Sequence, residues 1–419
     1  MRSKTRIGLL AVGAATLMTA ALGCSSSDTS DSSGSATSVA PKANADPADA
    51  SQSPVKVGFH NLEGGAISLP DLRLGFEAGI EYVNSELGGI NGHPMEAVYC
   101  NTDGTPDSSL NCGNTFVQDG VVLAVQGIDF GGDGILPALR SANIAEFGAI
   151  ALTPGLNAAV DDAAFGLTST EESYAADLVQ EAALGNSKIA VVFPDVPASR
   201  SSYDSVLKPV AAKLGLEVEP YYYAPGTDWT TQAATILAQS PDAISLWAAD
   251  ADSLAAVQAL RGAGFAGTIN ASSTTTIIDV LDPAMLEDVV FMTPYYNPDF
   301  VTVPEKAAAD IATFETYTDG KGITKTSQAL QGFYVAVQSA DILRQAPGDP
   351  ITADAVSTTI QTAKGDQFFS TGQYDCSRRT WPGTSACGTG MIFSKVNADK
   401  KLEVLDNQPV DVSGVRPAS

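Results

Sequence analysis

The feature that most constrains this fold is a helical pattern that stops at a cluster of glycines and gives way at once to an extended run. The stop lies between Asn84 and Cys100, in NSELGGINGHPMEAVYC. Before it, one apolar stripe recurs at helical spacing, at Leu72, Phe76, Gly79, Ile80 and Val83. Glycines just past a helix end accept left-handed backbone angles that other residues avoid. With the apolar run at 55–59, this predicts a β-α-β unit.

The alternation of strand and helix patterns continues along the chain. Further strands are predicted at 121–126, 150–153, 188–193, 217–223, 243–247, 268–271 and 289–293. Further helices are predicted at 135–142, 174–184, 205–214, 229–238, 252–262, 304–317, 328–344 and 353–363. After Gly390, the runs MIFSKV and LEVL predict a β-hairpin. Because 419 residues exceed one ordinary core, we expect an α/β protein with two parallel sheets, each covered by helices on both faces.

The first 23 residues are typical of a secretory signal. MRSKTR is basic, and the apolar run that follows is too short and too rich in Ala and Gly for a membrane span. The ending AALGC resembles a bacterial lipobox, which implies cleavage before Cys24 and a lipid on its thiol. Residues 24–53 are rich in Ser, Ala, Asp and Pro and predict a disordered tether. A soluble domain would then be anchored at the outer face of the cell membrane, and secretion without use of Cys24 is the alternative.

The charge of the chain excludes one class of partner. The formal net charge is -25, and nucleic-acid phosphates would be repelled by such a protein. The apolar fraction of 44% is large enough for a sizeable core. We therefore expect a soluble, acidic exported protein that does not bind nucleic acid.

Apart from Cys24, the cysteines form two pairs that are close in sequence. An exported chain with an even number of cysteines favours disulfides. Proximity suggests Cys100–Cys112 and Cys376–Cys387, although four cysteines allow three connectivities. A zinc site would need more histidines than the two in this chain, so no metal is expected.

The sequence contains none of three common catalytic or nucleotide-binding motifs. There is no G-x-S-x-G elbow, no H-E-x-x-H pair and no G-x-x-x-x-G-K-[ST] phosphate loop. We expect no enzymatic activity and no cofactor. An exported enzyme would have to use Glu63, Asp129 and His60, and a buried structural histidine is the more common situation for His60.

Several stretches resemble type I periplasmic solute-binding proteins, in particular the branched-chain amino-acid (Leu/Ile/Val) branch that serves ABC importers. The resemblance is carried by VKVGF, by YVNSELGGINGHPMEAVYC, by PDSSLNCGNTFVQDGVVLAVQG and by ILPALRSANIAEFGAIALTPG. It implies two doubly wound lobes joined by three crossovers, with the ligand bound between them. Lobe 1 would comprise residues 54–167 plus 297–367, and lobe 2 would comprise residues 168–296 plus 368–415.

The resemblance also assigns ligand contacts to individual positions. In amino-acid binders, a loop rich in Ser and Thr after the third strand holds the ligand carboxylate, and here that loop, 128–132, has no hydroxyl. Either backbone N–H groups of Gly131 and Gly132 take this role, or the ligand is not an α-amino acid. The ligand-binding candidates are Glu63, Asp129, Phe130, Gly131, Thr153, Asn157, Thr170, Glu171, Tyr203, Asp250, Ser273 and Tyr295. An acidic residue near Glu171 would bind the ligand ammonium.

The function that the resemblance implies is transport. The chain would be a monomer that captures a small solute, an amino acid or a related carboxylate or amide, and delivers it to an ABC permease in the membrane. A sensor or receptor of the same fold is the second hypothesis, and the exported enzyme is the third.

Overall fold

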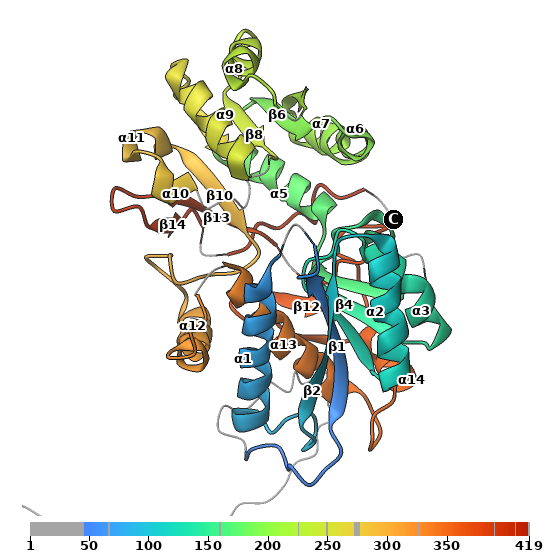
Figure 1. Ribbon diagram of the computed structural model, residues 1–419. Helices are drawn as coiled ribbons and strands as arrows, with labels where there is room; N and C mark the ends of the chain where they lie inside the picture. Colours follow the sequence, from blue (N-terminus) through green and yellow to red (C-terminus); the bar gives the residue numbers. More distant parts are fainter. Residues whose placement is uncertain are drawn as a thin grey trace, which may run out of the picture. The chain divides into compact units, whose positions relative to one another are not determined.

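The computed structural model describes residues 46–65, 68–158, 161–224, 226–248, 250–271, 277–324, 327–388, 390–406 and 408–417. The expected signal peptide, Cys24 and most of the expected tether lie outside these residues. The structure confirms the predicted fold class, with parallel strands, covering helices and two main sheets (Figure 1).

The first sheet has five strands, all parallel, in the order β2-β1-β3-β4-β5. The strands are β1 (Val55–Leu62), β2 (Met95–Thr102), β3 (Leu123–Gln126), β4 (Ala145–Ile150) and β5 (Ala164–Thr168). Val57 pairs with Ala97 on one side and with Leu123 on the other. Because the strands are parallel, all their carboxyl ends meet at one edge, where ligands commonly bind in such sheets.

Helices from distant parts of the chain surround this sheet. The helices are α1 (Pro70–Glu86), α2 (Pro106–Asp119), α3 (Leu136–Ser141), α4 (Pro154–Asn157), α12 (Glu305–Thr318), α13 (Ser327–Gln345) and α14 (Ala353–Ile360). Helix α13 packs against α1 and β4, and α2 packs against β1 and β2. On the α2 side, the Phe116 ring lies directly on Gly58, where a Cβ atom would come within 2.6 Å of the ring. The sheet therefore has an apolar layer on each face.

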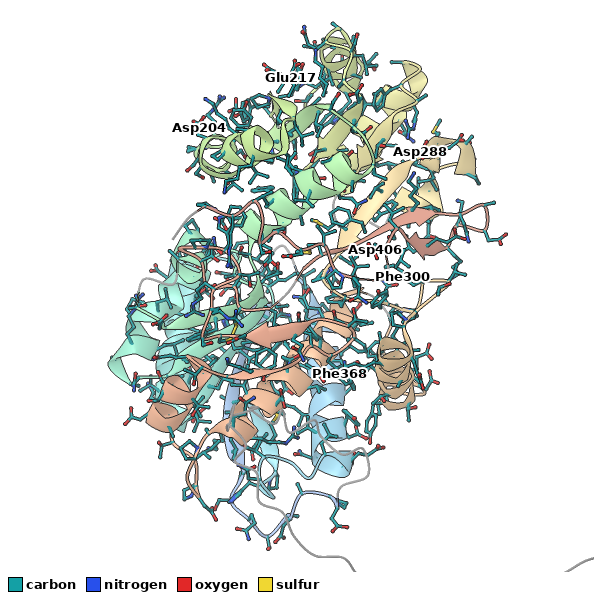
Figure 2. The ribbon with its side chains drawn as sticks, turned by 180° about the vertical axis from the view of Figure 1, so that it is seen from behind. Asp204, Glu217, Asp288, Phe300, Phe368 and Asp406 are labelled. Carbon is teal, nitrogen blue, oxygen red and sulfur yellow. A yellow bond between two sulfur atoms is a disulfide. The ribbon has the colours of Figure 1, made fainter. Side chains whose placement is uncertain are left out.

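Helices α1 and α13 approach each other closely because glycines line their contact. A Cβ atom on Gly75 would overlap the carbonyl oxygen of Ala329, and one on Gly332 would overlap that of Leu72. Beside this contact, the Phe333 ring of α13 lies against Tyr82 of α1 and Phe314 of α12. Phe368, which is labelled in Figure 2, stacks on Phe333 at 6.0 Å between centroids. This contact ties residues after 300 to the first sheet.

The second sheet has seven strands in the order β14-β13-β10-β9-β8-β6-β7. Its strands are β6 (Lys188–Pro194), β7 (Glu217–Tyr223), β8 (Ala243–Leu246), β9 (Thr268–Asn270), β10 (Val289–Thr293), β13 (Ile392–Val396) and β14 (Leu402–Val404). The helices of this part are α5 (Thr170–Ala183), α6 (Pro197–Ser202), α7 (Lys208–Leu214), α8 (Trp229–Leu237), α9 (Asp250–Gly262), α10 (Ile277–Val280) and α11 (Pro283–Leu286). The predicted C-terminal hairpin is confirmed, because β13 pairs antiparallel with both β10 and β14.

A loop closed by a disulfide extends the edge of the first sheet. After the small hairpin of β11 (Lys364–Asp366) and β12 (Gln373–Asp375), Cys376 is bonded to Cys387. Residues 385–388 then run beside β5, where Gly166 N donates to Ser385 O at 3.0 Å and Cys387 N donates to Gly166 O at 2.8 Å. The other disulfide joins Cys100 in β2 to Cys112 in α2. Both pairs expected from sequence proximity are therefore at bonding geometry.

The chain from Asp46 packs on the glycine turn, whereas its composition predicted a free tether up to residue 53. Ala48 N donates to Asn84 O at 2.7 Å, and Asp49 N donates to Gly92 O at 2.8 Å. Gly89 has a φ of +64°, and a Cβ atom there would overlap the carbonyl oxygen of His93. The turn therefore ends α1 and also receives the segment that precedes β1.

Several predicted boundaries need correction. Strand β4 runs over Ala145–Ile150 and not over 150–153, because the buried Glu146 interrupts the apolar pattern. Helix α7 begins at Lys208, after a π-helical turn, Tyr203–Leu207. The pattern also missed the short β5 and the β11–β12 hairpin. None of the helices that the structure describes has the length and apolar content to cross a bilayer.

Candidate functional site

The loops at the carboxyl edge of the first sheet are held together by their own polar side chains. Asn61, near the end of β1, accepts from Ile128 N at 3.1 Å and donates to Leu69 O at 2.8 Å. Glu63 accepts from Arg73 Nε at 3.0 Å, and its carboxylate is almost fully buried. The charge of Glu63, a predicted ligand contact, is thus already neutralised by Arg73.

Asp129 lies inside the domain, where its carboxylate is fully occupied. His60 Nδ1 lies 3.1 Å from Asp129 Oδ2, Ser109 Oγ donates to the same oxygen at 2.6 Å, and Gly131 N donates to Oδ1 at 3.0 Å. Burial opposes its charge, but the hydrogen bond and charge of His60 hold the pKa of Asp129 below its usual value. The Gly131 N–H that was expected to bind a ligand carboxylate is therefore already used within the loop.

His60 is the centre of a buried acid–base cluster. Its Nε2 lies 2.9 Å from Glu146 Oε1, and no part of the imidazole is exposed. Burial disfavours the charged ring, but the Glu146 and Asp129 carboxylates together raise the pKa of His60 to about 9. Burial also raises the pKa of Glu146. This cluster stabilises the positions of β1, β4 and the loop after β3.

Phe130 is the candidate that this edge presents to solvent. Its exposed fraction is 57%, although it directly follows the fully buried Asp129. Gly131 behind it packs so closely on the backbone of Thr105 that a Cβ atom would overlap the carbonyl group. The loop therefore turns its acidic side chain inward and its aromatic ring outward.

The turn after β4 is organised by Asp133, which is not among the predicted ligand contacts. Asp133 Oδ1 accepts from the Thr153 hydroxyl and, at 3.0 Å, from Leu156 N. Asn157 Nδ2, at the end of the same turn, donates to Glu171 Oε2 at 2.7 Å. The structure thus brings together the predicted residues Asn157 and Glu171, and Asn157 Oδ1 is buried without a hydrogen-bond partner.

The start of α5 holds two of the predicted ligand contacts, Thr170 and Glu171. Ser169 caps the helix by accepting from Glu172 N at 3.1 Å. Thr170 and Glu171 are half-buried, whereas Glu172 is fully buried. Glu172 Oε1 accepts from Gly390 N at 3.1 Å. Glu172 therefore joins two of the segments that pass between the sheets.

The remaining candidates do not gather at this edge. Tyr203 donates to Val218 O at 3.0 Å, within the second sheet and its helices. Tyr295 is buried and donates to Ser327 O at 3.3 Å, and burial raises its pKa. Asp250 is the first residue of α9, and its side chain lies outside the described part of the structure. Ser273 lies outside the described residues altogether.

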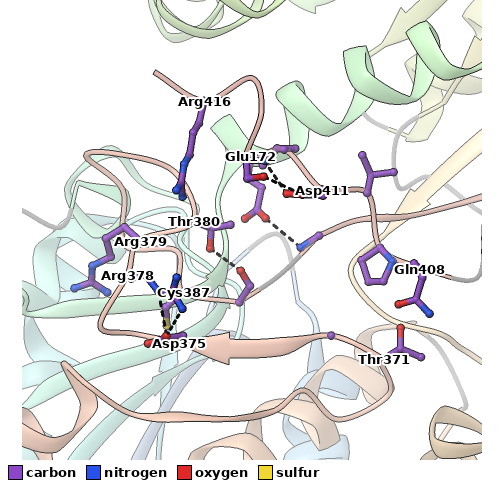
Figure 3. Close-up of a pocket in the computed structure, with 17 residues that line it drawn as sticks. Glu172, Thr371, Asp375, Arg378, Arg379, Thr380, Cys387, Gln408, Asp411 and Arg416 are labelled. Atoms are coloured by element: carbon purple, nitrogen blue, oxygen red, sulfur yellow. Dashed lines mark hydrogen bonds and ion pairs between the residues drawn. The ribbon is translucent and has the colours of Figure 1, made fainter. Parts of the chain in front are cut away.

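A cavity of about 430 Å³ lies beside the start of α5, and we name it the tail cavity (Figure 3). It is lined by Glu172, by residues of the disulfide loop (371–388), by Gly390 and by residues 408–416 of the C-terminal tail. None of the predicted ligand contacts lines it. Within the described residues, no group of three His, Cys, Asp or Glu side chains could hold a metal ion.

Comparison with known proteins gives a family match and many similar structures. A sequence model of the family described as "Periplasmic binding protein" matches residues 54–400. No curated protein sequence matches the chain.

Similar structures include the branched-chain amino acid transporter substrate binding protein LivJ from Streptococcus pneumoniae in complex with isoleucine. It is 15% identical, with a TM-score of 0.66 over 84% of this chain and 99% of that chain. An ABC transporter substrate binding protein from Aeropyrum pernix is 16% identical and has a TM-score of 0.70. The match covers 86% of this chain and 98% of that chain. An ABC transporter substrate-binding protein from Sphaerobacter thermophilus is 15% identical and has a TM-score of 0.69. The match covers 86% of this chain and 99% of that chain. These likenesses concern the fold.

Proposed function

Since this chain belongs to the periplasmic binding protein family, we propose that it captures a small amino acid, or a related carboxylate or amide, and delivers it to an ABC permease. The observation that carries the proposal is the family match over residues 54–400. The ligand class is supported by the isoleucine complex of the LivJ structure. The absence of a recognised catalytic motif in the sequence agrees with a binding role.

The proposed ligand site is the carboxyl edge of the first sheet. Phe130 supplies an exposed apolar surface there. Asn157 and Glu171 supply oxygen atoms that suit an ammonium group, and Asn157 Oδ1 has no partner in the described structure. The hydroxyl of Thr153 is held by Asp133, so it would contribute by accepting from the ligand. The ligand would be enclosed by a hinge motion of the two lobes.

The proposed location is the outer face of the cell membrane, with a lipid on Cys24. The support is the signal-like start of the sequence and the AALGC ending. Changing Cys24→Ala should release the protein from the membrane fraction. Unchanged membrane retention of that variant would refute the lipid anchor and would leave the ligand proposal untouched.

The ligand proposal is tested by thermal denaturation of the mature protein with a panel of amino acids, small amides and small carboxylates. A ligand that binds only the folded state raises the melting temperature, and the rise grows with the logarithm of the ligand concentration above Kd. We expect one or more apolar amino acids to do so. If every amino acid and amide leaves the melting temperature unchanged, the amino-acid assignment is wrong, and mass spectrometry of a co-purified ligand would identify the true class.

A further inference from the structure

The tail cavity is built from parts of the chain that are far apart in sequence. Glu172 comes from the start of α5, Thr371 and Arg379 come from the disulfide loop, and Val410 and Arg416 come from the C-terminal tail. Its volume of about 430 Å³ is within the range of small-molecule sites. Glu172 is next to Glu171 of the proposed ligand site, but neither Glu171 nor any other residue of that site lines the cavity, so an occupant there would be a second ligand.

The wall formed by the disulfide loop is firmly fixed. Cys376 is bonded to Cys387, and Gly388 N donates to Leu167 O at 2.9 Å, beside β5. Thr380 on the same wall donates to Gly388 O. Such bonds hold the lining groups in place before a ligand arrives, which reduces the entropic cost of binding.

The charges of this wall are compensated within the protein. Asp375 is paired with Lys364 at 3.0 Å and with Arg378 at 3.2 Å. Arg379 is paired with Asp162 at 2.6 Å. Arg378 and Arg379, the two arginines of this wall, therefore each have a carboxylate partner within the protein.

Arg416 is different, because its guanidinium has no carboxylate partner among the described residues. Figure 3 shows it extending from the C-terminal tail toward the wall that carries Thr380. Asp411, the other charged residue of the tail in the cavity, accepts from Ser413 N and Ser413 Oγ, both at 2.8 Å. A guanidinium with free donors is well suited to bind a planar carboxylate by two parallel hydrogen bonds.

The other end of the cavity is polar and uncharged. Thr371 and Gln408 lie together there (Figure 3), and Thr371 Oγ1 is buried without a hydrogen-bond partner. Pro409, Val410 and Val412 also line the cavity and provide apolar contact. A buried hydroxyl without a partner is costly, and a ligand group that accepts or donates a hydrogen bond would relieve that cost.

We propose that the tail cavity binds a small organic acid that carries one carboxylate and, at its other end, a neutral polar group. The carboxylate binds Arg416, the carbon chain lies along the tail valines, and the polar group bonds with Thr371. Glu172 does not repel this anion at neutral pH, because burial raises the pKa of its side chain to about 8.

The test uses isothermal titration of the mature protein with 4-hydroxybutyrate, butyrate and inorganic phosphate at constant ionic strength. We expect 4-hydroxybutyrate to bind more tightly than butyrate. Arg416→Gln should weaken both carboxylates by about tenfold or more, because a hydrogen bond to a charged group is lost. Thr371→Val should remove the preference for the hydroxy acid.

Arg200→Gln is the matched control, because Arg200 is an exposed arginine in an ion pair with Asp195 outside the cavity. It should leave the affinity for both carboxylates unchanged. Binding of phosphate alone, equal affinity for the two carboxylates, or equal affinity in Arg416→Gln would each overturn the proposal. Phe130→Ala alters the carboxyl edge and should leave the affinity for 4-hydroxybutyrate unchanged. Failure of the proposed amino-acid site can therefore be distinguished from failure of the proposed tail-cavity site.

Discussion

His60 and Asp129 form a buried ion pair at the first sheet, with 3.1 Å between Nδ1 and Oδ2 and with neither side chain exposed. Glu146 lies on the other ring nitrogen, at 2.9 Å. Removing His60 would leave two carboxylates buried side by side without a cation. We expect His60→Ala to lower the free energy of unfolding by about 3–5 kcal/mol, as measured by urea denaturation.

The other histidine of the chain provides the control. His93 pairs with Asp349, which is 83% exposed, so that ion pair contributes little. His93→Ala should cost about 1 kcal/mol or less through this ion pair. Similar losses in the two variants would show that the buried cluster is not a significant source of stability.

Glu172 predicts a dependence of stability on pH. Burial raises its pKa from the ordinary 4.5 to about 8, so the folded state holds this proton more tightly than the unfolded state does. Its contribution to stability is complete below pH 4.5 and is lost as the pH rises toward about 8. Glu172→Gln should flatten the fall of melting temperature over this range. Glu217→Gln, on the exposed strand β7 (Figure 2), should keep the original pH profile, and a Glu172→Gln profile identical to it would contradict the assignment.

The close contact between α1 and α13 predicts that adding one methyl group at the contact destabilises the fold. In Gly75→Ala the new Cβ atom meets the carbonyl group of Ala329, so one helix has to move. We expect a loss of about 1–3 kcal/mol in the free energy of unfolding. Gly262→Ala in α9 is the control, since nothing lies within 4 Å of its Cβ position. That variant should be neutral or slightly stabilising, because alanine favours a helix.

Phe130 predicts a specific loss of ligand affinity. Phe130→Ala removes an exposed ring from the proposed site, and we expect amino-acid affinity to fall roughly tenfold while the melting temperature without ligand stays the same. Val301→Ala is the matched control, because Val301 is 55% exposed and lies outside the proposed site. If both variants bind the ligand as the unmodified protein does, Phe130 does not contact it.

The disulfides predict the thiol content of the mature protein. Titration of the unfolded, unreduced protein should detect no reactive thiol from Cys100, Cys112, Cys376 or Cys387. Reduction should expose all of them and lower the melting temperature, since loss of a disulfide commonly costs 2–5 kcal/mol. Detection of two or more thiols before reduction would refute the pairing.

Local patterns were sufficient to predict most elements of the two sheets, because long apolar periodicities reflect burial directly. Strand β4 was displaced in the prediction because Glu146 interrupts its apolar run. That residue is tolerated inside only because His60, 86 positions earlier, bonds to it. Such a partner cannot be identified from the local pattern. Gly79 in the helical stripe was a usable sign of the close helix contact, since a Cβ atom there would approach Ala336 to 2.7 Å.

The candidate site could be predicted as a set of loops but not in its detail. Parallel topology places the ends of β1, β3 and β4 at one edge, whichever side chains they carry. The loop IDFGGDG contains two aspartates, and the family resemblance predicted Asp129 as a ligand contact. The structure shows Asp129 bonded inward to His60 and Asp133 bonded to the turn at Thr153. The direction of each carboxylate depends on distant partners.

The attachment of residues 48–49 to the glycine turn determines where a membrane tether would pull. The turn precedes Met95, at the amino end of β2, and the 8 residues of that strand rise about 3.3 Å each, so the ligand loops lie about 25 Å from the point of attachment. Under the proposed anchoring, mechanical load would enter through α1 and through the edge of the first sheet at which β2 begins. The edge that carries the ligand loops would remain turned away from the attachment point. The segments that join the two lobes would then carry no tension during the proposed hinge motion.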